Sequence, residues 1–403
     1  MNRFFHILKS IRFILFSKIN FRDPKKKKII VFDCDTQSYV KNFFSKKISF
    51  VLTTRSYKFK EIYISPTILS FVIKNFFKRI IKKNYLIILI KLINPKVIYT
   101  IIDNSPDFHY IYKIFEKKIK FLAIQNATRE YRMMKVKDTR EVYLPEYYCY
   151  SEYDKNYFLR KKIAIKKINI SGSFRNSLAL EYIKKKKIKI NKKKFDICVI
   201  GEADKIWQKE NSNQKMIDKR NVNRIMKDGD HIKKLGYSGG LIGFYAHTLS
   251  KKFNLKMVIA GKFEEGTRER EYELNFYKHY LKTDDFNLIP NEPEKFSNYA
   301  LVLQSRLILA TDSTLLREAI GLDKKIFACN YSGHSDINFF DNKLKKFSTT
   351  INSYEVFEKK ILDALKISEK DYFRYLGKNK NYIMNNSKNF HEKFQNRVFK
   401  IIK

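Results

Sequence analysis

Residues 311–314, Thr-Asp-Ser-Thr, follow an apolar segment and precede a helical pattern. A Ser or Thr at the start of a helix leaves backbone N–H groups and the positive end of the helix dipole available to an anion. We therefore expect Asp312, Ser313 and Thr314 to form a diphosphate site. Glu318, about one turn into the helix, is placed to reach a sugar hydroxyl. The alternative is a capped helix with nothing bound, because such helix starts are common.

Polar residues also follow apolar segments in the first half of the chain. Asp103 and Asn104 follow one such segment, and Gln125 and Asn126 follow the next. Since ligands of parallel α/β sheets bind beyond the carboxyl ends of the strands, we expect these side chains to line a cleft. For Asp103 and Asn104, an Asx-turn is an equally good explanation.

Glycines, a hydroxyl and two cations occupy comparable positions further along the chain. Arginine suits a phosphate because its planar fork matches two oxygens, and the loop 201–204 follows the first strand expected in the second half. We expect five such residues to belong to the same diphosphate-binding site as Asp312, Ser313 and Thr314: Ser173, Arg175, Gly201, Gly261 and Lys262.

Short apolar runs alternate with helical patterns along the chain, which is typical of a parallel sheet covered on both faces. The expected strands of the first half are 27–34, 48–54, 61–65, 95–102 and 119–126, and those of the second half include 195–204, 255–262, 306–312 and 324–330.

This alternation predicts an α/β fold of two Rossmann-like, doubly wound domains facing each other across a cleft. The lysine-rich stretch 183–194 is a plausible boundary. We predict a first domain at 1–182, a basic linker at 183–194, a second domain at 195–368 and a helical tail at 369–403.

The chain has 403 residues and a net charge of +42. Such an excess attracts phosphates and could indicate nucleic-acid binding. However, the lysine runs at 25–28, 184–187 and 192–194 fall between apolar segments, and no nucleic-acid-binding motif accompanies them. The abundance of Lys, Ile, Asn, Phe and Tyr is typical of proteins encoded by AT-rich genomes, and this bias in composition is the favoured explanation of the charge. We therefore expect no nucleic-acid partner. The charge should still draw the surface towards anionic lipids and nucleotides.

The N-terminal residues 1–21 mix apolar and basic side chains and lack a signal-peptide cleavage site. They predict either a basic helix lying on a membrane or an ordinary helix packed on the first sheet. No apolar stretch reaches the roughly 18–20 residues of a transmembrane helix. The cysteines are scattered, and three lie in or beside apolar runs, which argues against disulfides or zinc and fits a reducing compartment. They are Cys34, Cys149, Cys198 and Cys329.

Motifs for nucleotide hydrolysis and dinucleotide redox chemistry are missing from the sequence: there is neither GxxxxGK[ST] nor GxGxxG after a strand. Asp33-Cys34-Asp35 has the letters of a DxD motif but lies in the first strand–helix turn. We therefore expect no metal and no cofactor, with diphosphate charge met by helix N-termini and Arg or Lys.

Five segments, in this order, resemble the GT-B glycosyltransferases of bacterial surface carbohydrate biosynthesis. They are IYTIIDNSPDFHYIYKIF (98–115), FLAIQNATREYR (121–132), YCYSEYDKNYF (148–158), NISGSFRNS (169–177) and TDSTLLREAIGLDKKIFACN (311–330). One departure is Ala127, where the family pattern usually has glycine. The backbone there either approaches a ligand less closely or needs no positive φ.

The resemblance implies a cytoplasmic enzyme, peripheral on the inner membrane, that moves a sugar from a nucleotide-sugar donor to a surface glycan or lipid-linked glycan. The second domain would bind the donor, and Asn104, Gln125 and Asn126 would line the acceptor side. An inverting transferase needs a base for the acceptor hydroxyl. Asp35, Asp33 and Asp103 are the candidates in no secure order, and Asp35 is an equally good helix cap.

Two other functions remain open at this stage. A sugar-nucleotide epimerase or a polyol-phosphate transferase could use the same fold, because fold does not fix chemistry. A basic nucleic-acid-binding protein is the alternative from another class, and steep salt dependence would reveal it.

Overall fold

The computed structural model describes residues 18–33, 38–53, 61–76, 78, 81–128, 142–203, 219–333, 339–386 and 388–403. The chain forms two compact units. The first consists of Met1–Cys149, Asp154–Ile170 and His391–Lys403, and the second of Tyr150–Tyr153 and Ser171–Phe390.

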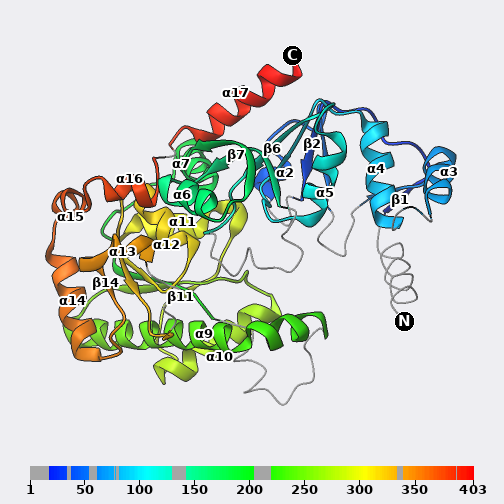
Figure 1. Ribbon diagram of the computed structural model, residues 1–403. Helices are drawn as coiled ribbons and strands as arrows, with labels where there is room; N and C mark the ends of the chain where they lie inside the picture. The colour runs from blue at the N-terminus through cyan, green and yellow to red at the C-terminus, as the bar shows by residue number, and fades with distance from the viewer. Residues whose placement is uncertain are drawn as a thin grey trace. The chain divides into compact units, whose positions relative to one another are not determined.

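The first unit is built on a six-stranded parallel sheet of order β3-β2-β5-β6-β7-β8 (Figure 1). Its strands are β2 (Ile29–Phe32), β3 (Ser49–Leu52), β5 (Val97–Thr100), β6 (Lys120–Ile124), β7 (Tyr143–Cys149) and β8 (Ala164–Ile170). The helices between and after them are α2 (Ser38–Lys41), α5 (Pro106–Phe115), α6 (Glu152–Arg160) and α17 (Phe390–Ile402).

One expected strand lies outside this sheet. The segment predicted at 61–65 contains β4 (Glu61–Tyr63), which pairs in parallel with β1 (Lys18–Asn20) to form a separate two-stranded sheet. Two helices follow, α3 (Pro66–Lys74) and α4 (Ile81–Ile93).

The second unit has another six-stranded parallel sheet, of order β11-β10-β9-β12-β13-β14. Its strands are β9 (Phe195–Ile200), β10 (Met257–Ala260), β11 (Leu288–Ile289), β12 (Ser305–Ala310), β13 (Lys325–Cys329) and β14 (Ser348–Thr349). Its helices are α7 (Phe174–Lys185), α9 (Lys219–Phe253), α10 (Arg268–Leu281), α11 (Ser297–Gln304), α12 (Thr314–Gly321), α13 (Phe339–Asn342), α14 (Tyr354–Lys366), α15 (Glu369–Leu376) and α16 (Asn379–Ile383), with 3-10 turns η2 (Pro293–Lys295) and η3 (Lys345–Phe347).

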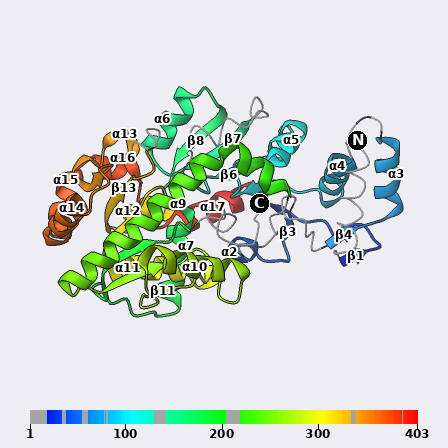
Figure 2. The ribbon, with the colours of Figure 1, turned by 90° about the horizontal axis from the view of Figure 1, so that it is seen from below.

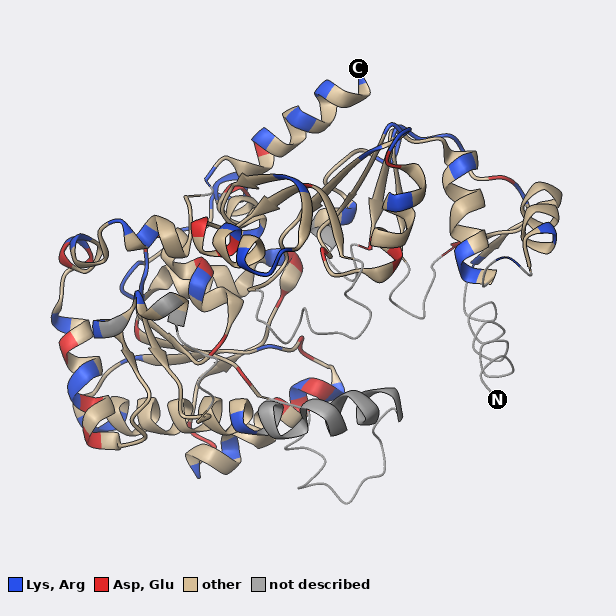
Figure 3. Cartoon of the chain, in the orientation of Figure 1, with Lys and Arg blue, Asp and Glu red and all other residues tan. Residues whose placement is uncertain are grey.

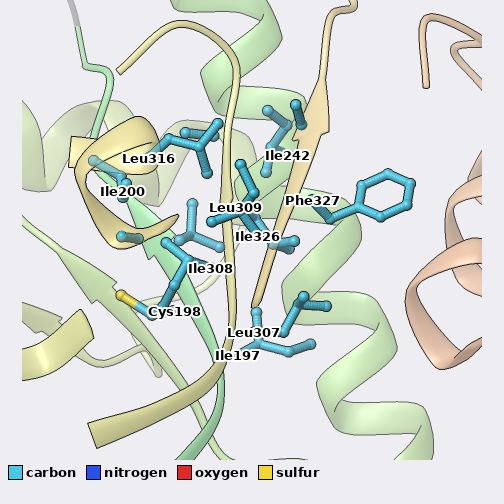
Figure 4. Packing of buried hydrophobic residues seen from close by; sticks show 14 of the residues in the cluster. Ile197, Cys198, Ile200, Ile242, Leu307, Ile308, Leu309, Leu316, Ile326 and Phe327 are labelled. Atoms are coloured by element: carbon cyan, nitrogen blue, oxygen red, sulfur yellow. The ribbon is translucent and has the colours of Figure 1, made fainter. Parts of the chain in front are cut away.

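Helices cover both faces of this second sheet. The long helix α9 runs beside α10 on one face (Figure 1; Figure 2), and α11 and α12 lie on the other. The central strands β9, β10, β12 and β13 are mostly apolar, as expected for strands whose two faces are both covered. Figure 4 shows Ile197 and Leu307, which are paired on the neighbouring strands β9 and β12, in the core of this unit. Two parallel, doubly wound sheets are the predicted fold class, and this prediction is confirmed.

The boundary between the units differs from the predicted linker at 183–194. The first of these residues belong to α7, which begins at Phe174, and the second unit starts already at Ser171. The reason is a set of side-chain bonds that the sequence does not reveal. Ser173 and Asn176, at the start of α7, both hydrogen-bond to Glu318 of α12.

The predicted tail, 369–403, is helical as expected but does not form one piece. Helices α15 and α16 belong to the second unit, whereas α17 from His391 onwards belongs to the first. Arg397 of α17 donates two hydrogen bonds to the Glu146 carboxylate of β7, at 3.0 and 2.8 Å. Phe394, on the same helix, is fully buried against the rings of Tyr99 and Tyr148.

Glu146 is a buried carboxylate whose charge is stabilised by its neighbours. Burial acts to raise its pKa, but hydrogen bonds from Arg397 and Tyr148, with Lys120 at 3.3 Å, lower the pKa to about 2. Helix α17 is therefore tied to the first unit by an ion pair that is fully charged near neutral pH.

Candidate functional site

The carboxyl ends of β9 and β12 lie side by side because the two strands pair in parallel, with Val199 opposite Leu309. Glu202, just beyond β9, reaches across to the turn beyond β12. Its two carboxylate oxygens accept the backbone N–H groups of Thr311 and Asp312, each at 2.9 Å. One side chain thus fixes the turn that leads into α12.

Glu202 was not singled out from the sequence, although its loop, 201–204, was. Burial raises its pKa, and the two backbone N–H groups and the charge of Lys262 offset part of this effect. Two N–H groups of the turn that precedes the helix are therefore already bonded to a carboxylate of the protein. A phosphate at this helix start is left with the amides that follow Asp312.

The predicted cluster at the start of α12 is assembled as expected. Ser313 caps the helix, and its hydroxyl accepts the N–H of Leu315 at 3.3 Å. The Thr311 hydroxyl lies 2.8 Å from that of Ser238 on α9. Asp312, Ser313 and Thr314 are half-buried, so they remain accessible to a ligand.

Glu318, one turn into α12, is almost fully buried, with 1% of its surface exposed. One carboxylate oxygen accepts the Ser173 hydroxyl at 2.5 Å, and the other accepts the Tyr299 hydroxyl at 2.8 Å. Burial raises the pKa of Glu318, although the charges of Arg175 and Arg317 and the two hydroxyls oppose this effect.

The structure therefore brings Ser173, Arg175 and Glu318 together, although the sequence placed the first two in another domain than Glu318. A sugar hydroxyl at Glu318 would have to share or replace one of the hydroxyls that the carboxylate now accepts. Carboxylate oxygens carry two lone pairs each, so sharing is chemically feasible.

Arg317, beside Glu318, was missed from the sequence, and its neighbours are far from it along the chain. It is fully buried and donates to the backbone carbonyl of Ile383 and the hydroxyl of Ser151, both at 2.7 Å. The rings of Tyr150 and Tyr153 lie 5.3 and 5.2 Å from its guanidinium. These contacts hold α12 in place, and no spacing in the sequence signals them.

Gly201 and Gly261 both lie against the buried Glu273. A Cβ on Gly261 would come within 2.6 Å of the Ile289 carbonyl oxygen and 2.9 Å of a Glu273 carboxylate oxygen. A Cβ on Gly201 would come within 2.8 Å of the Ala260 carbonyl. Both glycines thus serve close packing at this edge. Lys262 follows with an exposed side chain, while its backbone N–H donates to Glu273 at 2.7 Å.

Replacing Gly261 with alanine should destabilise the second unit by about 1–3 kcal/mol, because the added methyl meets backbone that cannot move aside. Urea denaturation would measure this loss. Gly266→Ala is the matched control: a Cβ there meets nothing within 4 Å, and only its positive φ of 72° costs energy. A loss of less than about 1 kcal/mol in Gly261→Ala would show that packing at this position does not require glycine.

In the first unit, Asp33, Asp103 and Gln125 follow β2, β5 and β6, which are neighbours in the sheet, so the predicted gathering at one edge is found. The Asp33 carboxylate accepts the Ser105 hydroxyl, and that of Asp103 accepts the Tyr147 hydroxyl at 2.7 Å.

Three side-chain amides, those of Asn104, Gln125 and Asn126, lie at the same edge of the first sheet. Gln125 donates to Asp154 at 2.7 Å and to the carbonyl of Ala127 at 3.0 Å, while Asn104 and Asn126 are half-buried. Ala127 has no positive φ, which explains why alanine is tolerated where the family pattern has glycine. Asp35, the remaining candidate base, lies outside the described residues.

Within the described residues, no group of three or more His, Cys, Asp or Glu side chains is arranged to hold a metal ion. None of the described helices combines the length and apolarity needed to cross a bilayer. Cys149, Cys198 and Cys329 are buried, and for Cys198 and Cys329 the apolar runs around them predicted this. Cys34 lies outside the described residues.

Comparison with solved structures adds to the evidence on the fold. The UDP-GlcNAc 2-epimerase of Neisseria meningitidis bound to UDP-GlcNAc is 12% identical (TM-score 0.50, covering 92% of this chain and 99% of that one). A putative UDP-N-acetylglucosamine 2-epimerase of Listeria monocytogenes is 9% identical (TM-score 0.52, 92% and 96%). The wall teichoic acid polymerase TagF with CDPG is 12% identical (TM-score 0.52, 98% and 92%). At these identities the likeness concerns the fold alone.

By sequence, no curated protein matches the chain. Residues 151–348 match a family described as a putative O-antigen biosynthesis protein. This span contains β9 to β13 and the turn into α12, and so includes the candidate site of the second unit. Over residues 151–348 this match agrees with the resemblance to bacterial surface carbohydrate biosynthesis proteins seen in the sequence, and the solved structures agree with the fold of two parallel sheets.

Proposed function

We propose that this protein is a glycosyltransferase that moves a sugar from a nucleotide-sugar donor to a bacterial surface glycan without an obligatory metal. One arrangement carries the proposal. Helix α12 begins at the carboxyl edge of the second sheet with Ser313 and Thr314 accessible, and Glu318, Ser173 and Arg175 cluster one turn further on. The whole arrangement falls within the span that matches the O-antigen family.

In this proposal the donor diphosphate binds at the N-terminus of α12. The helix dipole and the amides after Asp312 would stabilise the negative charge that grows on the leaving nucleotide. Arg175 and Lys262 would add positive charge, and Glu318 would accept a hydroxyl of the ribose or the sugar. Gly201 and Gly261 would contribute by keeping the strand ends closely packed.

The proposed acceptor side is the carboxyl edge of the first sheet, with Asn104, Gln125 and Asn126. The base that removes the acceptor proton would be Asp33, Asp35 or Asp103. Hydrogen bonds from Ser105 to Asp33 and from Tyr147 to Asp103 hold two of these carboxylates in fixed positions, which general-base catalysis requires.

Transfer can be tested with labelled nucleotide sugars and glycan or lipid-linked glycan acceptors, by following label into the acceptor. If Asp103 is the base, Asp103→Asn should lower turnover by about 10²- to 10⁴-fold and leave donor affinity unchanged. Asp107→Asn is the control, because Asp107 pairs with the exposed Lys82 at 2.6 Å. Wild-type turnover in Asp103→Asn would leave the role to Asp33 or Asp35, and absence of transfer with every acceptor would contradict the proposal.

Two related activities are the alternatives. Structures similar to this chain include UDP-GlcNAc 2-epimerases and a teichoic acid polymerase with CDPG, so epimerisation and polyol-phosphate transfer fit the same fold. An epimerase would convert the sugar of its nucleotide substrate without any acceptor, and a polyol-phosphate transferase would use CDPG in place of a nucleotide sugar. Incubation of a nucleotide sugar alone, of a nucleotide sugar with acceptor, and of CDPG with acceptor therefore separates the three.

We place the protein in the cytoplasm, at the inner membrane, where lipid-linked acceptors would be found. The net charge of +42 favours anionic lipid over a neutral surface. The basic N-terminus was the predicted contact, and residues 1–17 lie outside the described residues. Nucleic acid is not among the proposed partners.

A further inference from the structure

Helix α3 is apolar on two sides, and only one of them is buried. Ile68 is 2% exposed and belongs to the core of the first unit. Leu69, Ile73 and Phe76, in contrast, are 49%, 71% and 48% exposed. Their spacing of four and three residues places them in one stripe along α3 and the turn that follows it. Together with Ile81, which is 40% exposed at the start of α4, we call them the α3 face.

Basic residues outnumber acidic ones near the α3 face, although Lys82 pairs with Asp107 and Asp23 bonds to Ser65 at the start of α3. Between residues 62 and 93 the sequence contains six basic residues and no acidic one. Lys74 and Lys78, beside the stripe, are exposed. In the cartoon of Figure 3, the ribbons of α3 and α4 are tan with blue stretches that mark lysine and arginine. Large apolar side chains rimmed by lysines differ from an ordinary solvated helix surface, which would be polar.

We propose that the α3 face is the surface by which this protein docks on an anionic lipid bilayer. In an interfacial helix, Leu, Ile and Phe enter the boundary between headgroups and acyl chains, while lysines reach the lipid phosphates. Lysine stems also lie along apolar surface with their charges in water, so both contacts can form together. Helix α3 has nine residues and is far too short to span a membrane.

Charge decides between a bilayer and a second copy of the chain. A symmetric dimer through this face would bring the same patch against itself, and Lys74 and Lys78 would face their own counterparts. Like charges brought together across an interface disfavour association. An anionic bilayer has the complementary charge and accepts the apolar stripe without requiring a shaped partner.

Docking through the α3 face would bring the enzyme to a lipid-linked acceptor, and this purpose rests on the proposed function. The docking itself does not depend on it. Vesicle binding can be measured with neither donor nor acceptor present. A failure to bind would therefore leave the transfer reaction untouched, and a failure of transfer would not affect the binding result.

The test is co-sedimentation of the full chain with vesicles of phosphatidylcholine, alone or mixed in equal parts with phosphatidylglycerol. We expect wild type to bind the mixed vesicles. Leu69→Ser with Ile73→Ser should lower the affinity for these vesicles by about tenfold or more, because two apolar side chains no longer enter the bilayer. Lys74→Glu with Lys78→Glu should weaken binding to the mixed vesicles to a similar degree.

The matched control is Leu159→Ser with Lys161→Glu at the end of α6, where both side chains are also exposed. The control should bind like wild type, and all variants should melt like wild type because none of the replaced side chains is buried. Unchanged binding of both α3 variants, or equal loss in the control, would overturn the proposal. So would binding that is lost on deleting residues 1–17 but kept in both α3 variants, or α3 variants that alter only the oligomeric state.

Discussion

Replacing Glu318 with glutamine is expected to weaken donor binding by about 10- to 100-fold, the effect of losing one hydrogen bond to a charged group. The same change should leave the melting temperature unchanged or raise it. Burial raises the pKa of this carboxyl, so its charged form costs folding energy that a neutral amide avoids. Glutamine can still accept from one of the Ser173 and Tyr299 hydroxyls and donate to the other.

A variant that is as stable as wild type yet binds its donor poorly has the signature of a residue retained for function. Glu271→Gln is the control in the same unit, since Glu271 is exposed on α10. Donor titration and thermal melting of the two variants side by side give both quantities. Unchanged donor affinity in Glu318→Gln would remove Glu318 from the proposed site, and a large drop in melting temperature would make its role structural.

Replacing Arg397 with alanine is expected to lower the free energy of opening of α17 by about 3–5 kcal/mol, because it leaves the buried charge of Glu146 without its main partner. Glu146 is 3% exposed, so water can reach its carboxylate only through the space that the Arg397 side chain, 33% exposed, would vacate. Native-state hydrogen exchange of the amides in β7 and α17 would measure the change. Lys393→Ala, an exposed position on the same helix, should have little effect.

This ion pair also predicts a pH dependence. The folded pKa of Glu146, about 2, lies below the ordinary pKa of a glutamate side chain, 4.5. Stabilisation by Glu146 is therefore complete above its unfolded pKa and is lost as pH falls towards the folded value. Wild type should lose protection in α17 between about pH 5 and pH 2, and Arg397→Ala should lose much less. Parallel losses in the two proteins would contradict the assigned role of the pair.

The fold was largely predictable from the sequence because strands buried on both faces are written as short, continuous apolar runs. β9, β12 and β13 are examples, and the turn into α12 could be recognised by its hydroxyl side chains. Sheet membership was harder to predict. The strand at Glu61–Tyr63 has a similar pattern but pairs with β1 in a separate sheet, because local pattern does not specify the neighbour.

The features that the sequence did not predict are contacts between residues far apart along the chain. Glu146 and Arg397 are 251 positions apart, and Ser173 and Glu318 are 145 apart. Neither pair has a local signature, so the return of α17 to the first unit and the start of the second unit at Ser171 could not be foreseen. Glu202 was overlooked for the same reason, since its role depends on the parallel pairing of β9 and β12.

The central claim is that the carboxyl edge of the second sheet binds a nucleotide sugar, and calorimetric titration of the full chain with UDP-, GDP-, CMP- and TDP-sugars tests it most directly. We predict saturable binding of one nucleotide class to wild type, unaffected by removal of divalent cations with a chelator. We also predict much weaker binding of that donor to Glu318→Gln. No binding of any donor, or equal affinity of wild type and Glu318→Gln, would contradict the claim.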